Sequence, residues 1–297
     1  MTTRPPQESE LPLQVSKIVS TLVDSHVHIH PRYDLQRVLD AAGNNTRAAA
    51  TQLGLGSGVV GCLLLAENPG AEAFVTLHAG AGSEPHPDAG PGGSLSGWSL
   101  QRTGEPDSVL AIHPSLPRLL IMAGRQVATT DGLEVLALLT ARRFPAGLDV
   151  AAAVAAARAA GAIVVIPWGF GKWTFRRGRL VAELLRTAGQ PLFLGDNGGR
   201  PRLSRTPRLL RAAERAGMPI LPGSDPLPLP GHETRAGSYG FVAPIDPGTA
   251  TPAAVLREWL QSLQHQPRTF GHGTRLGPFL RDQVLMQIRR RRGGARR

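Results

Sequence analysis

Between residues 148 and 225 the sequence repeats one unit three times: a helical stretch, a glycine and a short apolar run. The three units are LDVAAAVAAARAAG with AIVVIPWG, GRLVAELLRTAG with PLFLGDN, and TPRLLRAAERAG with MPILPGSD. Glycine commonly ends a helix, and a short apolar run bounded by turn residues is typical of a buried strand. This alternation predicts a parallel sheet or a barrel built from βα units.

Polar residues follow these predicted strands, in PWGFGK, GDNGGR and GSDP, where βα folds place their sites. The remaining sequence fits the same class. We predict a helix over 34–54, a buried strand in 57–68, and two strands in 116–140 with a turn at Asp131-Gly132. Two amphipathic helices near 252–264 and 276–291 complete the chain. The segment 79–97 is a low-complexity loop that could border a cleft.

The chain has 297 residues, of which 41% are hydrophobic, enough for one large α/β domain or about two smaller ones. The single cysteine, Cys62, rules out an intramolecular disulfide and fits a reducing cytoplasm. The polar start MTTRPPQESELPLQ does not resemble a secretory signal. The longest apolar region is interrupted by Arg158, Gly161 and Pro167, so we expect no membrane span.

The formal net charge of +11 raises the possibility of nucleic-acid binding. Lys17 and Lys172 are the only lysines, and much of the excess charge lies in the C-terminal RRRRGGARR, which is also typical of a solvated chain end. We expect an N-terminal extension over 1–21, the main domain over 22–265, and a C-terminal helix with a basic tail over 266–297. The oligomeric state is not predicted.

The stretch LVDSHVHIHPRYD, residues 22–34, carries an acidic residue and three histidines at every second position. Side chains alternate across a strand, so we expect Asp24, His26, His28 and His30 on one face. His26 and His28 could bind one divalent ion, with Asp24 as a further ligand or as the group that orients a ligand. The alternative is a set of hydrogen-bonded polar residues at a strand end.

The order of motifs resembles the PHP family, the polymerase and histidinol phosphatase metal-dependent phosphoesterases. DSHVHIHP is similar to the first motif of that family, which implies that His26 and His28 are ligands. CLLLAENPG stands where the family has Thr-Asp-His, with Glu67 at the place of the Asp and Asn68 at that of the His. MAGRQVATTDGLEVLAL resembles the segment whose Gly-x-Glu bridges two metals, but it carries Gln126 instead of the Glu.

Later motifs depart further from the family. AIVVIPWGFGKW lacks the usual histidine, and FLGDNGGRP resembles the following strand end through Asp196 and Asn197. PILPGSDPLP keeps Asp225 but has Leu227 in place of a histidine. The resemblance implies a distorted (β/α) TIM-like barrel of the PHP type. The amidohydrolase superfamily is a neighbouring comparison, but the two strands around Gln126 favour the PHP-like one.

The surviving donors predict one ion rather than three. His26, His28 and Asp225 can hold one Zn, Mn or Fe ion and leave a position for water. A further set could supplement them: Asp24, Glu67, Asp196, His232 and, through its carbonyl oxygen, Gln126.

Two segments are candidates for contacting the substrate. PWGFGKWTFRRGR contains Lys172, Arg176 and Arg177, which could bind an anion or simply begin a solvated helix. LPLPGHETRAGSYG contains His232, a candidate general acid or base, and Arg235, a further candidate for binding the substrate, although a polar surface loop explains both equally well.

The sequence therefore predicts a metal-dependent hydrolase that acts on a small anionic substrate, with a phosphoester implied by the resemblance. One alternative is a catalytically degenerate PHP-like scaffold that binds a ligand or a partner protein. A weaker alternative is nucleic-acid binding or processing through the arginines. The sequence has no Gly-x-Ser-x-Gly elbow, no Walker loop and no Cys-x-x-Cys motif, so it gives no support to a serine nucleophile or a nucleotide-binding loop.

Overall fold

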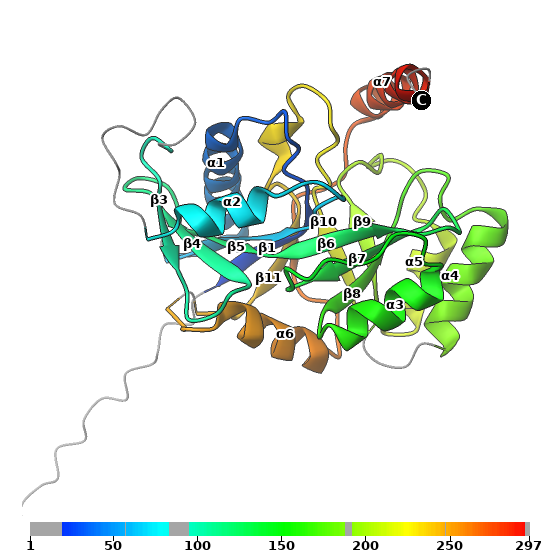
Figure 1. The fold of residues 1–297 in the computed structure, drawn as a ribbon, viewed down its shortest axis with the longest axis horizontal. Coiled ribbons are helices and arrows are strands. Elements are labelled where there is room, and N and C mark those ends of the chain that lie inside the picture. The colour runs from blue at the N-terminus through cyan, green and yellow to red at the C-terminus, as the bar shows by residue number, and fades with distance from the viewer. Residues whose placement is uncertain (1–19, 57, 83–94, 188–191, 247, 295–297) are drawn as a thin grey trace, which may run out of the picture.

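The computed structural model describes residues 20–56, 58–82, 95–187, 192–246 and 248–294 (Figure 1). Most of the expected N-terminal extension, the centre of the loop predicted over 79–97 and the last three residues of the basic tail lie outside these ranges. No helix in the described part of the chain is long and apolar enough to cross a membrane.

One sheet of the structure has seven strands. They are β1 (Thr21–Val27), β2 (Val60–Leu65), β3 (Ser99–Arg102), β4 (Ser108–Ile112), β5 (Leu119–Met122), β11 (Gly240–Ala243) and β12 (Thr269–Phe270). Their order across the sheet is β12-β11-β1-β2-β5-β4-β3. Strands β1, β2 and β5 run parallel, whereas the other pairings are antiparallel. Because β12 pairs with β11, the C-terminal segment contributes to the sheet.

The second sheet has five strands: β6 (Gly124–Ala128), β7 (Glu134–Leu138), β8 (Ile163–Pro167), β9 (Leu192–Asn197) and β10 (Ile220–Gly223). Their order is β10-β9-β8-β7-β6. The three strands predicted from the helix–strand repeat, β8 to β10, are parallel neighbours, so that prediction is confirmed. The two strands on either side of Asp131-Gly132 form an antiparallel hairpin, and Gly132 adopts a φ of 72° in its turn.

The expected TIM-like barrel of the PHP type is wrong, because the described strands form two separate sheets and not one closed barrel. The edge of β1 opposite β2 pairs with β11, so β10 lies beside β1 without joining its ladder. The two sheets also meet where the segment after β2 approaches β6. Within the described residues they are joined there through an isolated bridge between Glu67 and Arg125 and not through a continuous ladder. The antiparallel β6, β7 and β11 therefore interrupt the βα repeat that closure of a barrel would need.

The helices of the described residues are α1 (Leu35–Leu53), α2 (Ala73–Gly80), α3 (Val150–Ala159), α4 (Phe175–Thr187), α5 (Arg208–Arg215), α6 (Pro252–Ser262) and α7 (Leu276–Gly294). Helices α1 to α5 cover the outer faces of the sheets, whereas α6 and α7 lie elsewhere on the molecule. Helices α1 and α2 pack on the seven-stranded sheet, whereas α3, α4 and α5 pack on the five-stranded one. Figure 1 shows α6 below the sheets and α7 at the opposite side of the molecule. The predicted helices over 34–54, 252–264 and 276–291 correspond to α1, α6 and α7.

The largest apolar core lies between the two sheets and includes Leu64 of β2, Val165 of β8, Phe241 of β11 and Leu256 of α6. Burial of side chains from both sheets in one core holds the carboxyl ends of β1, β9 and β10 close together. These strand ends carry the histidine-rich segment, Asn197 and the turn that contains Asp225.

Candidate metal centre

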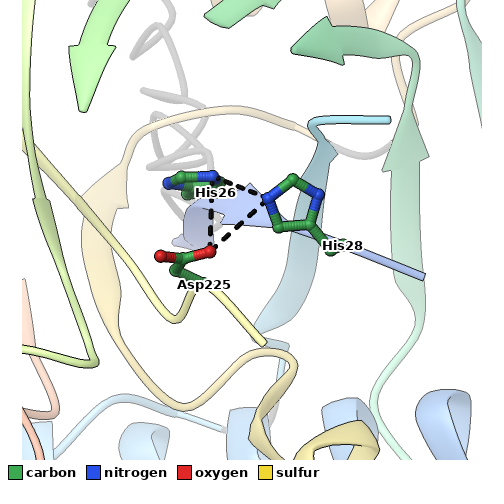
Figure 2. Close-up of side chains that lie close together, drawn as sticks. All are labelled: His26, His28 and Asp225. Atoms are coloured by element: carbon green, nitrogen blue, oxygen red, sulfur yellow. Dashed lines mark hydrogen bonds and ion pairs between the residues drawn. The ribbon is translucent and has the colours of Figure 1, made fainter. Parts of the chain in front are cut away.

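His26, His28 and Asp225 converge at the carboxyl ends of β1 and β10 (Figure 2). The Nε2 atoms of the two histidines are 3.0 Å apart. Oδ1 of Asp225 is 3.6 Å from Nε2 of His26 and 3.5 Å from Nε2 of His28. Both imidazoles and one carboxylate oxygen therefore point to the same small volume. Within the described residues, this is the one group of three or more His, Cys, Asp or Glu side chains that is close enough to share an ion.

These distances fit the spacing of ligands around a metal ion. Ligand atoms about 2.0–2.2 Å from one ion, at angles between octahedral and tetrahedral, lie about 2.8–3.6 Å from one another. The three observed separations fall in that range. Two imidazole nitrogens and one carboxylate oxygen are also the donor set of many zinc and iron sites that keep a position open. The residues present therefore fit one divalent ion.

The backbone fixes Asp225 against β1. Its amide donates a hydrogen bond to the carbonyl oxygen of His26 over 2.8 Å. Its φ is 47°, a left-handed conformation that costs a non-glycine residue about 1–3 kcal/mol and is found preferentially at functional sites. The side chain is held as well, because Nδ2 of Asn197 donates to Oδ2 of Asp225 over 2.8 Å. Oδ1 is thereby directed to the histidines.

Close approach of β10 to β1 requires the glycine at position 223. A Cβ atom there would lie 2.4 Å from the backbone nitrogen of His26 and 2.5 Å from its Cβ. Contacts this short do not occur in folded proteins, so no larger residue fits without movement of His26. Gly223 thus allows the ligand from β1 and the ligand after β10 to meet.

The electrostatics of the site favour the protonation states in which these side chains bind a metal ion. Burial, reinforced by the neighbouring His26, lowers the pKa of His28 to about 3, so its imidazole is neutral at physiological pH. Burial alone would raise the pKa of Asp225, but His26, His28 and Lys172 outweigh it and hold that pKa below its ordinary value. A neutral imidazole and an ionised carboxylate are the forms that bind metals.

Asp24 does not join the other three, contrary to the expected alternation. The pairing of β1 with β2 shifts register between Asp24 and Val27, and this irregularity breaks the strict alternation of side chains. The Asp24 carboxylate is fully buried and accepts hydrogen bonds from the backbone amides of Ser224 and Gly237, each at 2.8 Å. Burial raises its pKa to about 7. Asp24 ties β1 to the loops after β10 and before β11.

His30, the last histidine of the predicted series, also has another partner. Its Nε2 lies 2.8 Å from the carbonyl oxygen of Pro226, and its ring stacks on that of His28. Tyr33 donates its hydroxyl to the carbonyl oxygen of Leu227. Both side chains therefore support the loop that follows Asp225.

Glu67 is committed to an ion pair instead of the metal site. Its Oε2 accepts from Nη1 of Arg125 at 2.8 Å, and its Oε1 accepts from the amide of Phe74 at 2.9 Å. Sequence inspection did not identify Arg125, the residue directly before Gln126, as the partner of Glu67. Gln126 itself donates to Oδ1 of Asn68 over 3.1 Å, while its Oε1 is buried without a hydrogen-bond partner among the described residues.

Asp196 faces away from the cluster. Arg200 binds its carboxylate with two hydrogen bonds of 2.7 Å, and the hydroxyl of Tyr239 donates to it over 2.8 Å. Side chains alternate along β9, so Asp196 and Asn197 point to opposite faces of the sheet. The structure selects Asn197, the neutral member of this pair, as the residue that contacts Asp225.

A cleft of about 430 Å³ opens above the cluster, a size typical of small-molecule sites. It is lined by His28, Asp225, Gln126, Lys172 and residues of α7 that include Phe279. The Lys172 ammonium forms an ion pair with Glu134.

The predicted arginines do not line this cleft. Nη2 of Arg176 lies 3.6 Å from Oδ1 of Asp131, and Arg177 donates to the carbonyl oxygen of Gly171. The basic run thus supplies the cleft with Lys172 alone. The start of α4 turns both arginines outward.

His232 and Arg235 also lie outside the cleft, where they hold α7 in place. His232 accepts a hydrogen bond from the amide of Leu227 through Nδ1, and its Nε2 lies 3.1 Å from Oδ2 of Asp282. Arg235 donates to the same carboxylate oxygen over 2.9 Å. His232 is buried and none of its atoms lines the cleft, so the structure gives it no position for acid–base chemistry there.

Sequence reasoning missed the contribution of α7. This helix lines the cleft with Phe279, Asp282, Gln283, Met286 and Gln287. Glutamines at such spacing are ordinary on solvated helix faces, so no sequence signal distinguished them. Asp282 was the accessible clue, because it is the one acidic residue in the very basic C-terminal segment from 266 onward.

Comparison with known proteins adds little. No protein-family model matches the chain, and no curated protein matches it. PsfC from Pseudomonas syringae is a similar solved structure, with 16% sequence identity over 92% of this chain and 98% of PsfC, and a TM-score of 0.49. A likeness of this size carries no argument about activity, so the function has to be inferred from the site itself.

Proposed function

We propose that the protein is a hydrolase that uses one divalent ion, Zn, Mn or Fe, held by His26, His28 and Asp225, to cleave a small anionic substrate. Phosphoesters are the first class to test, and the proposed compartment is the reducing cytoplasm, where a single buried cysteine such as Cys62 is stable. The observation that carries the proposal is the set of three ligand-atom separations of 3.0, 3.5 and 3.6 Å at the base of the cleft.

When bound, a divalent ion supplies a Lewis acid that makes water a nucleophile near neutral pH. The chain contributes the rest. Asn197 orients the Asp225 carboxylate, and burial keeps His28 neutral. The cleft above the cluster is large enough for a small substrate, and side chains of α7 form part of its wall.

Lys172 is the proposed anion-binding group. It is the one lysine or arginine among the described residues that line the cleft, and its charge helps to lower the pKa of Asp225. Its ion pair with Glu134 holds the ammonium at the cleft wall. An incoming phosphate or carboxylate would compete with Glu134 for this ammonium, so binding strength depends on how easily that pair opens.

One observation favours the alternative of a non-catalytic scaffold. All three carboxylates expected to supplement the ligands are committed elsewhere, Glu67 and Asp196 to arginines and Asp24 to backbone amides. The cluster therefore offers three protein donors, and the two histidines are close enough to satisfy each other by a hydrogen bond. A protein that retained this arrangement for stability alone would need no ion.

The metal content of the purified protein distinguishes the hydrolase from the non-catalytic scaffold. Protein purified without a metal-affinity tag is analysed for bound metals and assayed against a panel of phosphomonoesters and phosphodiesters, with and without added Mn or Zn and with a chelator. We expect one ion per chain and chelator-sensitive hydrolysis. Asp225→Asn should lose both, because a neutral amide binds a cation far less well than a carboxylate.

Asp246→Asn is the matched control, since Asp246 is exposed and its carboxylate accepts from the amide of Gly248, away from the cluster. It should retain both the metal and the activity. Wild-type protein that is folded, free of metal and inactive under every condition would establish the scaffold instead.

A further inference from the structure

A second hollow, of about 510 Å³, lies beside the first turn of α7 and is separate from the cleft over the metal-site candidates. Its walls come from the loop around η1 (His232–Arg235), from the segment 272–275 and from the start of α7. None of the residues that line it also lines the cleft. What occupies this hollow is therefore a separate question.

The charged side chains that line the hollow are all cationic. Arg235, Arg275 and Arg281 contribute guanidinium groups, and no aspartate or glutamate is among the lining residues. One carboxylate lies behind them: Asp282 pairs with Arg235 at 2.9 Å and with Arg281 at 3.0 Å. Three fixed positive charges thus share one negative charge, which leaves an excess of two.

The excess positive charge is concentrated on Arg275. Its side chain is exposed and has no ion pair or hydrogen bond with any other described residue. The hydroxyls of Ser238 and Thr274 line the same hollow and are likewise without a partner in the described part of the chain. Unused guanidinium and hydroxyl donors that face one space match the acceptors of a phosphate or sulfate group.

The ring nitrogens of the two histidines that line the hollow are already engaged within the protein: His232 contacts Leu227 and Asp282, and His272 contacts Arg202 and Gly273. The pKa of His232 is lowered by burial and by the neighbouring Arg235, which favours its neutral form. His272 has Nε2 at 2.9 Å from Nη1 of Arg202, which makes that nitrogen an acceptor, and its Nδ1 lies 3.1 Å from the carbonyl oxygen of Gly273. The N-terminal end of α7, whose partial charge is positive, borders the hollow at Pro278.

We propose that this hollow binds a multiply charged oxyanion of the phosphate type, with Arg275, Arg281 and Arg235 as its cationic partners. The volume exceeds that of a single phosphate, so a diphosphate or a phosphorylated small molecule fits the class. The site does not depend on the proposed hydrolase function, because it contains none of the three residues that converge on the metal centre, His26, His28 and Asp225.

The test is a titration of the full chain with inorganic pyrophosphate and with inorganic phosphate, followed by calorimetry at constant ionic strength set with sodium chloride. The protein is first treated with a chelator, which is then removed. Wild type is compared with Arg275→Ala, Lys172→Ala and Arg208→Ala, and Arg275→Lys is titrated as a fifth protein. Arg275 is exposed and unpaired, so its replacement should not disturb folding. Arg208 is an exposed arginine of α5 and serves as the control for loss of one positive charge.

We expect wild type and Arg208→Ala to bind pyrophosphate alike and Arg275→Ala to bind it about tenfold more weakly, the usual effect of losing one charge-assisted hydrogen bond. Arg275→Lys should recover part of the affinity, because a lysine keeps the charge but not the two-pronged geometry. Weakening by Lys172→Ala and not by Arg275→Ala would place the anion in the cleft and overturn the proposal. Equal binding by all five proteins, or none by wild type, would overturn it too.

Discussion

The backbone amide of Asp225 donates a hydrogen bond of 2.8 Å to the carbonyl oxygen of His26. This bond joins the first strand of the seven-stranded sheet to the loop after the last strand of the five-stranded sheet, which do not pair along their length. The two candidate ligands are therefore positioned by the junction of the sheets. Any change that separates β10 from β1 should disturb the metal centre as well as the fold.

Replacement of Gly223 by alanine tests that dependence. The new methyl group would lie 2.5 Å or less from backbone and Cβ atoms of His26, so β10 has to move away. Overpacking of this kind costs about 1–3 kcal/mol in the free energy of unfolding. We expect lower stability in urea together with weaker metal binding. Gly56→Ala is the control, because a Cβ at Gly56 meets no atom within 4 Å. Normal metal affinity in Gly223→Ala would show that the junction does not set the ligand geometry.

The helix–strand repeat and the boundaries of α1 could be predicted from the sequence because they depend on local features, whereas α2 was not predicted. In α1, for example, Asp34 caps the first turn through hydrogen bonds to the amides of Gln36 and Arg37, and Gly54 ends the helix at a φ of 66°. The parallel order of β8 to β10 follows from the helices between them. The antiparallel pairing of β11 with β1 is a contact between distant segments, and it decides against a closed barrel.

The residues of the candidate site also divide into those that local sequence predicts and those that tertiary contacts decide. The register of β1 shifts between Asp24 and Val27, so His26 lies within the irregular stretch, His28 lies beyond it, and Asp24 marks its start. Such an irregularity leaves no trace in the spacing of residues, so a regular alternation wrongly grouped Asp24 with the histidines. Glu67 and Asp196 have the side chains of metal ligands, but their arginine partners are brought to them by tertiary structure.

Lys172→Ala should weaken the binding of anionic ligands in the cleft without changing metal content. Lys172 lines the cleft, whereas Arg176, four residues later, points to Asp131 outside it. Removal of a charged hydrogen-bond donor from a ligand site costs about tenfold in affinity. Inhibition of hydrolysis by phosphate, compared between Lys172→Ala and Arg176→Ala, measures the effect. Equal inhibition constants in both variants would remove Lys172 from the site.

Glu67→Gln should reduce stability and leave metal content unchanged. The Glu67 side chain is buried and pairs with Arg125, also buried, so the neutral amide leaves this guanidinium with Glu72, 4.0 Å away, as its remaining counter-charge. Breaking a buried ion pair on one side costs about 3–5 kcal/mol, reduced here by the hydrogen bond that an amide oxygen can still accept. Urea unfolding and elemental analysis of the same preparation provide both readouts. A fall in bound metal in protein that remains folded would return Glu67 to the ligand set.

The contact of Asp282 with His232, Arg235 and Arg281 should make the attachment of α7 sensitive to acid. Burial alone would raise the pKa of Asp282, but the hydrogen bond from Arg281 and the charges of His232 and Arg235 outweigh it, so the folded-state pKa lies below the ordinary value of 3.8. A lowered carboxyl pKa stabilises the folded protein at pH values above the unfolded pKa, and this contribution disappears as the pH falls through the folded-state pKa. Asp282→Asn should therefore be less stable than wild type at pH 6. The difference between the two should shrink below about pH 4.

The measurement is the free energy of unfolding in urea for wild type and Asp282→Asn between pH 6 and pH 3. Asp246→Asn is again the control, since Asp246 is exposed and no cationic side chain pairs with it among the described residues. Wild type and Asp282→Asn share every other titrating group, so the difference between their free energies of unfolding reports on position 282. A difference between wild type and Asp282→Asn that stays constant over the whole range would mean that the Asp282 carboxylate gains nothing from His232, Arg235 and Arg281. In that case the apolar contacts of Phe279 with the cleft wall, including its edge-to-face contact with Phe170, would have to hold α7 in place.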